Sequence, residues 1–204
     1  MKPLDAIRLI VSLGVATVWG GVKWWLSTRP ERLRRRRIAQ AGTTLVDGAV
    51  VTLTGEVRAL ERTLAAPLTY AACVAFDVRG YSIELSDLAV RDCRGVAFVL
   101  DTGAAQVIVD EATPDIELPG KPLLRRDMVG LRSFCERKGI EQDVSQWAFV
   151  ELAIVPGSRI AVHGRVVAEP DPTASTGYRD TSLRFRVVAL GFERLTITSP
   201  RGAH

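Results

Sequence analysis

Two short segments, Val51-Thr-Leu-Thr-Gly55-Glu-Val57 and Ile160-Ala-Val-His-Gly164-Arg-Val166, share one pattern. In each, apolar residues alternate along the chain and the segment closes on Gly-x-Val. Alternation with period two indicates a strand with one buried face. A glycine inside a strand usually marks a bulge or a sharp bend, which lets a small sheet curl. We therefore predict a curled, OB-like β-barrel or a pair of related half-barrels.

The rest of the body carries the same period-two signal, interrupted by turn-forming residues. Asp101-Thr102-Gly103 and Pro156-Gly157 have the composition of tight turns. The sequence therefore predicts a mainly β (α+β) fold. Further strands are expected at Ala72–Val78, Tyr81–Leu85, Val96–Leu100, Gln106–Asp110, Trp147–Val155, Leu183–Ala189 and Arg194–Thr198.

One amphipathic helix is expected from Leu123 to Ile140. Apolar residues recur there at helical spacing, and arginines occupy much of the opposite face. Pro122 is suited to open the helix and Gly139 to end it. A helix of this kind covers one side or the mouth of a β structure.

An apolar segment from Leu9 to Leu26 carries a single charge, at Lys23. Its 18 residues are near the minimum for crossing a hydrocarbon core about 30 Å thick. A transmembrane helix is favoured by this length and by Trp24 and Trp25, because tryptophan prefers the membrane interface. The alternatives are an interfacial amphipathic helix, for which the polar face is too narrow, and a cleaved signal peptide, for which a small-residue cleavage site is missing.

Basic residues after this segment set its expected orientation. Lys23 and six arginines follow the apolar stretch against one acidic residue, Glu31. By the positive-inside tendency, we predict a single-pass membrane protein, with the lipid bilayer as a partner and the C-terminal domain in the cytoplasm. The residues expected at the membrane interface are Lys23, Trp24, Trp25, Arg29, Arg32, Arg34, Arg35, Arg36 and Arg37.

The formal net charge of +4 hides an uneven distribution. Residues 1–40 hold nine of the 27 Lys+Arg and two of the 23 Asp+Glu, which leaves 18 against 21 in the remainder. Nucleic-acid binding needs a basic surface, so the slightly acidic body counts against that partner. We divide the chain into a flank (1–8), a transmembrane helix (9–26), a basic juxtamembrane segment (27–40), a β domain (41–199) and a disordered tail (200–204).

The sequence shows no catalytic or metal-binding pattern. Cys73, Cys93 and Cys135 are scattered, odd in number and form no C-x-x-C pair, which indicates reduced thiols. His163 lies in an expected strand, and no local spacing joins it to a cysteine as a dyad or a zinc site. We predict no catalytic residue, no metal and no cofactor. An enzyme using Cys73, Cys93 or His163 is the least favoured alternative.

Three stretches form a longer pattern. Gly55–Phe76 joins the Gly-x-Val strand to a Leu64-Ala-Ala-Pro67-Leu turn and a Cys73-Val-Ala-Phe76 strand. Phe98–Asp110 is a strand-turn-strand around Asp101-Thr-Gly103, and Glu151–Val166 is a Pro156-Gly157 hairpin that closes on Gly164-Arg-Val166. In this order they resemble the GIDE, or beside-a-membrane, domain of organelle ubiquitin ligases and of bacterial membrane proteins. The motif residues that the resemblance singles out are Gly55, Pro67, Cys73, Asp101, Gly103, Pro156, Gly157 and Gly164.

The resemblance implies a membrane-anchored β module. The ligases transfer ubiquitin through a carboxyl-terminal RING, and this sequence has no RING cluster of zinc-binding cysteines and histidines, so ligase activity is not carried over. The leading hypothesis is a non-enzymatic protein-interaction or scaffold domain with an unidentified protein partner. The alternative is single-stranded nucleic-acid binding on an OB-like face, with Phe76, Tyr81, Phe98 and Arg79 as the nearest stacking and basic residues.

Overall fold

The computed structural model describes residues 41–82, 88–110, 112–119, 123, 127–140, 144–171, 183–190 and 194–200. The chain divides into two units, Met1–Ala41 and Gly42–His204, and nearly all described residues belong to the second. The flank at 1–8, the expected membrane helix at 9–26, and the basic segment at 27–40 with its interface residues lie outside the described residues. Most of the tail at 200–204 does as well. Among the residues that are described, no helix is both long and apolar enough to cross a membrane.

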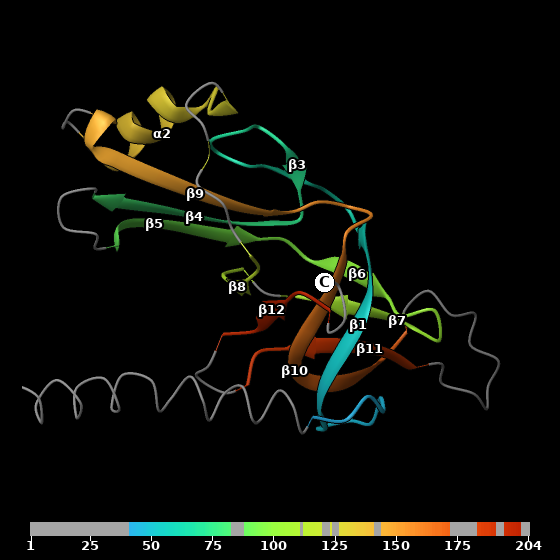
Figure 1. The fold of residues 1–204 in the computed structure, drawn as a ribbon. Helices are drawn as coiled ribbons and strands as arrows, with labels where there is room; N and C mark the ends of the chain where they lie inside the picture. Colours follow the sequence, from blue (N-terminus) through green and yellow to red (C-terminus); the bar gives the residue numbers. More distant parts are fainter. Residues whose placement is uncertain are drawn as a thin grey trace, which may run out of the picture. The chain divides into compact units, whose positions relative to one another are not determined.

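Five strands close into a β-barrel, which confirms the prediction of a mainly β fold with a barrel (Figure 1). The larger sheet has the order β1-β6-β7-β11-β10-β12-β8, and an additional pairing of β1 with β10 closes its first five strands. Strands β7 and β11 run parallel, and the other barrel pairs are antiparallel. The strands of this sheet are β1 (Val50–Ala59), β6 (Phe98–Asp101), β7 (Gln106–Val109), β8 (Asp115–Glu117), β10 (Arg159–Pro170), β11 (Leu183–Val188) and β12 (Thr196–Thr198).

The two Gly-x-Val segments are neighbours in the barrel and close it. Strand β1 pairs with β10 so that Gly55 lies opposite Ile160 and Val51 lies opposite Gly164. Strand β1 then continues onto β6 from Glu56, and β10 continues onto β11 from Arg165. Within the barrel each strand therefore pairs with two partners in succession, with its glycine next to the residue where the partner changes, and β10 pairs in addition with β12.

Close backbone approach explains both glycines. A Cβ at Gly55 would lie 2.5 Å from the carbonyl oxygen of Asp101, and a Cβ at Gly164 would lie 2.5 Å from that of Val188. The pairing register is continuous through both positions, so neither glycine is a bulge. They lie where neighbouring backbones come too near for any side chain.

The barrel is filled by the inward-facing residues of its strands. In β1 these are Val51, Leu53 and Val57, which alternate with more exposed residues as the sequence pattern predicts. Full burial of a side chain of this size stabilises the fold by about 1.5–3 kcal/mol. Ile197 of β12 and Ile116 of β8 extend the same buried cluster beyond the closed strands.

A second, smaller sheet has the order β5-β4-β9 and carries the helix on one face (Figure 1). Phe134 and Cys135 of the helix pack with Phe76 and Phe149 of this sheet in a separate buried cluster. The rings of Phe134 and Phe149 meet edge to face with their centroids 6.0 Å apart. The elements of this part are β4 (Ala75–Ser82), β5 (Leu88–Gly95), β9 (Trp147–Ile154), α2 (Leu131–Lys138), the 3-10 turn η2 (Val144–Gln146) and the short pair β2 (Leu64–Ala65) and β3 (Ala72–Cys73).

The helix is shorter than the sequence predicts. It ends as expected at Gly139, which has a φ of 65° and donates its N–H to the carbonyls of the last turn. Its expected start at Leu123 is wrong, because 127–130 are not part of the α-helix. Gly130 instead donates its N–H to the carbonyl of Leu68 at 2.8 Å. A Cβ at Gly130 would lie 2.1 Å from the carbonyl oxygen of Pro67, so this segment is shaped by contact with the loop after β2.

We predict that alanine at Gly55 or Gly164 destabilises the fold by about 1–3 kcal/mol, because either methyl group would collide with a backbone carbonyl oxygen. Gly42→Ala is the matched control, since a Cβ there has no neighbour nearer than 4.0 Å. Thermal or denaturant unfolding of the purified variants measures the difference. Melting temperatures equal to that of Gly42→Ala for both variants would contradict the close-approach explanation.

Candidate functional site

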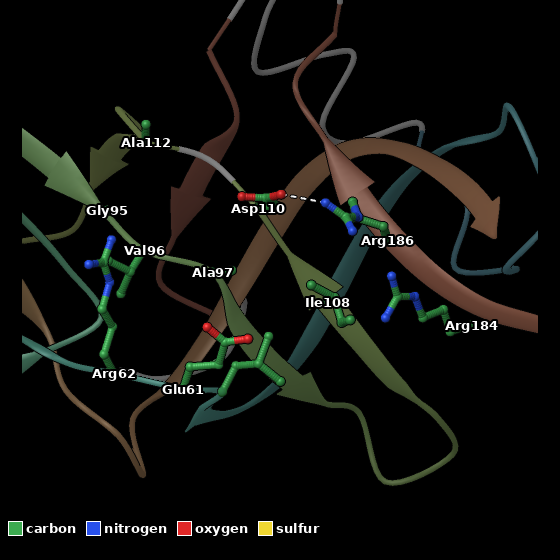
Figure 2. Close-up of a pocket in the computed structure, with 11 residues that line it drawn as sticks. Glu61, Arg62, Gly95, Val96, Ala97, Ile108, Asp110, Ala112, Arg184 and Arg186 are labelled. Atoms are coloured by element: carbon green, nitrogen blue, oxygen red, sulfur yellow. Dashed lines mark hydrogen bonds and ion pairs between the residues drawn. The ribbon is translucent and has the colours of Figure 1, made fainter. Parts of the chain in front are cut away.

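A cavity of about 550 Å³ opens on the outer side of β7 and β11 (Figure 2). Its walls come from segments that lie far apart in the sequence: residues 60–62 after β1, residues 95–97 before β6, the end of β7, and β11. The volume lies in the range of pockets that hold small organic ligands.

Two arginines of β11 form one wall and share a single carboxylate oxygen. Oε2 of Glu169 accepts from Nε and Nη2 of Arg184, at 3.3 and 3.1 Å, and from Nη2 of Arg186 at 3.2 Å. Nη1 of Arg186 pairs with the carboxylate of Asp110, as Figure 2 shows. The Nε of Arg186 is buried and has no hydrogen-bond partner in the part of the chain that the structure describes. These carboxylates therefore hold the two guanidinium groups in place but do not occupy all of their N–H donors.

The floor and the opposite wall differ in character. Val96, Ala97 and Ile108 give the cavity an apolar surface between the arginines of β11 and the segment after β1 (Figure 2). Arg62 and Glu61 lie across the cavity from Arg184 and Arg186 in Figure 2. Arg62 has no ion-pair partner among the described residues, whereas Arg184 has one and Arg186 has two. The site thus combines an apolar floor with guanidinium groups on two sides.

A second charged cluster ties the small sheet to the barrel sheet. The side chain of Asp77 in β4 is 0% exposed and accepts from Nε and Nη2 of both Arg79 and Arg91, at 2.7–2.9 Å. Arg79 also donates to the carbonyl of Ile116 in β8, and Arg91 also donates to Asp115. A buried carboxylate is tolerated only when it is paired in this way. We interpret this cluster as a structural joint, because every charged group in it has a partner.

The loop between β2 and β3 is held rigidly and presents an exposed tyrosine. The carboxylate of Glu151 in β9 accepts from the backbone N–H of Leu68 at 2.7 Å and of Thr69 at 3.2 Å. Tyr70 follows with a φ of 58° and is 53% exposed. A non-glycine residue in this left-handed region stores strain, which accumulates at functional positions. Val129, beside the Gly130 that the Tyr70 ring approaches, is 67% exposed.

The three cysteines have the character of inert thiols. Burial, followed by the charge of Glu151, raises the pKa of Cys73 to about 11. Burial, followed by Asp77, raises the pKa of Cys93 to about 11 as well, and burial raises the pKa of Cys135. A raised pKa keeps the thiol protonated, and the thiolate is the nucleophile. His163 is buried in β10, where Nδ1 lies 3.0 Å from Oγ1 of Thr52.

The structure brings five of the motif residues together at one end of the barrel. Gly55 faces the carbonyl of Asp101, and Gly157, with a φ of 87°, donates its N–H to the carbonyl of Val57 at 2.8 Å. Asp101 accepts from the N–H of Gly103, which has a φ of 81°. Pro156 precedes Gly157 in the turn between β9 and β10.

The remaining motif residues lie elsewhere. Pro67 lies in the loop between β2 and β3, Cys73 lies in β3, and Gly164 lies further along β10. All eight residues shape turns or close packing, and none of them lines the cavity. The cavity arginines at 62, 184 and 186 were not singled out from the sequence. The one available signal was the alternation of Arg184 and Arg186 along an expected strand.

The aromatic residues expected to stack bases do not gather into one surface platform, since only Tyr81 of the three is partly exposed. Phe76 and Phe98 are buried in the two cores, and Arg79 is occupied by Asp77. Within the described part of the chain, no group of three or more His, Cys, Asp or Glu residues is placed to hold a metal ion. Comparison of the chain with protein-family models, with curated proteins and with solved structures gave no match.

We predict that Asp77→Asn costs about 3 kcal/mol of stability, because it leaves two guanidinium groups facing a neutral buried side chain. A cost of about 3 kcal/mol is at the lower end of the range for breaking a buried ion pair, because both arginines keep partial contact with solvent. Glu136→Gln is the control, because it removes the carboxylate of an exposed ion pair with Arg132 on the helix surface and should cost about 1 kcal/mol or less. The free energy of unfolding is measured with denaturant. An equal loss of this free energy in the two variants would contradict the assignment of Asp77 as the centre of the joint.

Proposed function

We propose that this protein is a non-enzymatic β module, anchored in the membrane by one helix, that binds a protein partner at the cytoplasmic face. The observation that carries the proposal is the exposed pair of Tyr70 and Val129 on a rigidly held loop. Glu151 fixes this loop through backbone hydrogen bonds, and Gly130 packs against it. Exposed apolar side chains on a pre-organised surface favour protein binding, because little ordering entropy is lost on association.

The anchor rests on the sequence of residues 9–37. The apolar segment, the paired tryptophans and the arginine block support a single-pass helix with the β domain on the cytoplasmic side. The same arginines would hold the start of the domain near anionic lipid, at about 1 kcal/mol each. A binding surface on the domain would then be presented within reach of other membrane proteins.

The barrel supports the OB-like and GIDE-like part of the proposal. In chain order its strands lie first, second, third, fifth and fourth around the barrel, with the fourth closing on the first. A small five-stranded barrel of mixed strand order is the architecture of OB-folds. The Gly55 strand, the Asp101 turn and the Pro156-Gly157 hairpin are the segments that resemble the GIDE domain, and they meet at one end of this barrel.

Single-stranded nucleic-acid binding is the weaker candidate. The body beyond residue 40 carries more acidic than basic residues, and Phe76 and Phe98 face the cores. Base stacking needs exposed aromatic rings beside a basic groove. Ubiquitin transfer is not proposed, because the sequence offers no RING cluster.

Deleting residues 1–37 should release the remaining chain from the membrane as a folded, β-rich protein, because the proposed anchor lies wholly within the deleted part. Membrane fractionation with a carbonate wash, followed by circular dichroism of the soluble fraction, measures both properties. A folded truncated protein that still sediments with carbonate-washed membranes would show that the attachment lies elsewhere.

The partner surface is tested with Tyr70→Asn in the full chain. Asparagine adopts positive φ more readily than tyrosine, so we expect unchanged or slightly higher stability. At the same time, the loss of the ring should abolish capture of a protein partner. A photo-crosslinking residue at position 129 reports the capture in membranes, and the same residue at Leu183, which is also 53% exposed, is the matched control. Crosslinked proteins that are the same at both positions, or that persist in Tyr70→Asn, would contradict the proposed surface.

A further inference from the structure

The cavity beside β11 has more hydrogen-bond donors than the surrounding carboxylates fill. Each guanidinium group has five N–H donors. Among described residues, Arg184 and Arg186 together make four hydrogen bonds to carboxylate oxygens, and three of these converge on one oxygen of Glu169. The buried Nε of Arg186 has no acceptor within the described ranges of the chain. The guanidinium groups of this wall can therefore donate hydrogen bonds to further oxygen atoms.

The architecture of the wall fixes the arginines instead of leaving them free in solvent. Arg184 and Arg186 are two residues apart on β11 and so lie on the same side of the strand. Arg186 stands opposite Ile108 of β7, and Arg184 stands opposite Glu169 of β10. Both side chains are only about a quarter to a third exposed. Arginines positioned by carboxylates are pre-organised for bidentate recognition of an oxyanion.

The rest of the cavity indicates what else the ligand carries. Val96, Ala97 and Ile108 form an apolar floor that suits a hydrocarbon or aromatic body. Arg62, which has no described ion-pair partner, adds a third guanidinium on the other side (Figure 2). A cavity of about 550 Å³ that is partly open to solvent fits a small molecule better than a folded surface or a nucleic-acid strand.

We propose that this cavity binds a small organic anion, with a carboxylate or phosphate group held by Arg184 and Arg186 and an apolar body against Ile108. The proposal does not depend on the protein-binding surface at Tyr70, which lies in the loop between β2 and β3. The anion comes either from a free metabolite or from the head group of a membrane lipid, since both offer the same oxyanion. The chemistry of recognition is identical in the two cases.

The first experiment is calorimetric titration of the detergent-solubilised full chain with phenyl phosphate and with inorganic phosphate. Phenyl phosphate should bind about tenfold tighter, because only it also covers the apolar floor. Arg186→Gln and Arg184→Gln should each weaken binding by about tenfold or more, through loss of charge-assisted hydrogen bonds. Arg58→Gln is the control, because Arg58 pairs with Asp101 outside the cavity.

A second variant separates binding from folding. Ile108→Trp leaves every charge in place and fills the floor, so it should block phenyl phosphate while the melting temperature shows that the fold is retained. Two results would overturn the proposal: no binding of phenyl phosphate at millimolar concentration, or a loss of affinity in Arg58→Gln as large as that in Arg186→Gln. The second result would mean that only general attraction of anions to a basic surface was observed.

The source of the anion is decided in nanodiscs. The full chain in discs of phosphatidylcholine is compared with the chain in discs that also contain phosphatidic acid. If phenyl phosphate binds more weakly in the discs that contain phosphatidic acid, the lipid head group competes for the cavity, and the site is assigned to a lipid head group. Equal binding in both discs assigns it to a free anion.

Discussion

The closure of the barrel depends on two places where backbones approach so closely that no side chain fits between them. At Gly55 the neighbouring carbonyl belongs to Asp101, and at Gly164 it belongs to Val188. These contacts allow β1 and β10 to leave one barrel partner and join the next, so that the ten- and twelve-residue strands each pair with two strands of the barrel, and β10 pairs also with β12. A sheet whose strands could not change partners there would remain open, and its inner face would lose the enclosed core.

The barrel sheet and the small sheet are joined differently. Ala75, Leu152 and Ile154 of the small sheet reach the barrel core, whereas further along β4 the contact passes to the charged cluster around Asp77. Ionic pairing of this kind contributes less to net stability than apolar packing of the same volume, but its directional hydrogen bonds allow fewer relative orientations. The joint therefore fixes the angle between the sheets more than it holds them together.

Local patterns in the sequence predict the elements whose structure is decided locally. The alternation at Val51–Val57, the Pro156-Gly157 turn and the helix end at Gly139 all agree with the structure. The start of the helix does not, because a tertiary contact between Gly130 and Pro67 replaces its expected first turns. Strand β5 was missed because Arg91 and Arg94 break its apolar alternation, and the partner of Arg91 lies on another strand. The cavity could not be predicted, since it joins residues more than a hundred positions apart.

The small sheet is assembled from two separate insertions in the barrel. Strands β4 and β5 come from the connection between β1 and β6, and β9 comes from the connection between β7 and β10. Neither insertion contains a complete hydrophobic layer, because Phe149 and Phe134 belong to one and Phe76 to the other. Neither insertion can therefore bury its apolar side chains without the other, and a single proteolytic cut in either connection would not release a separable fragment, although the described residues form two cores.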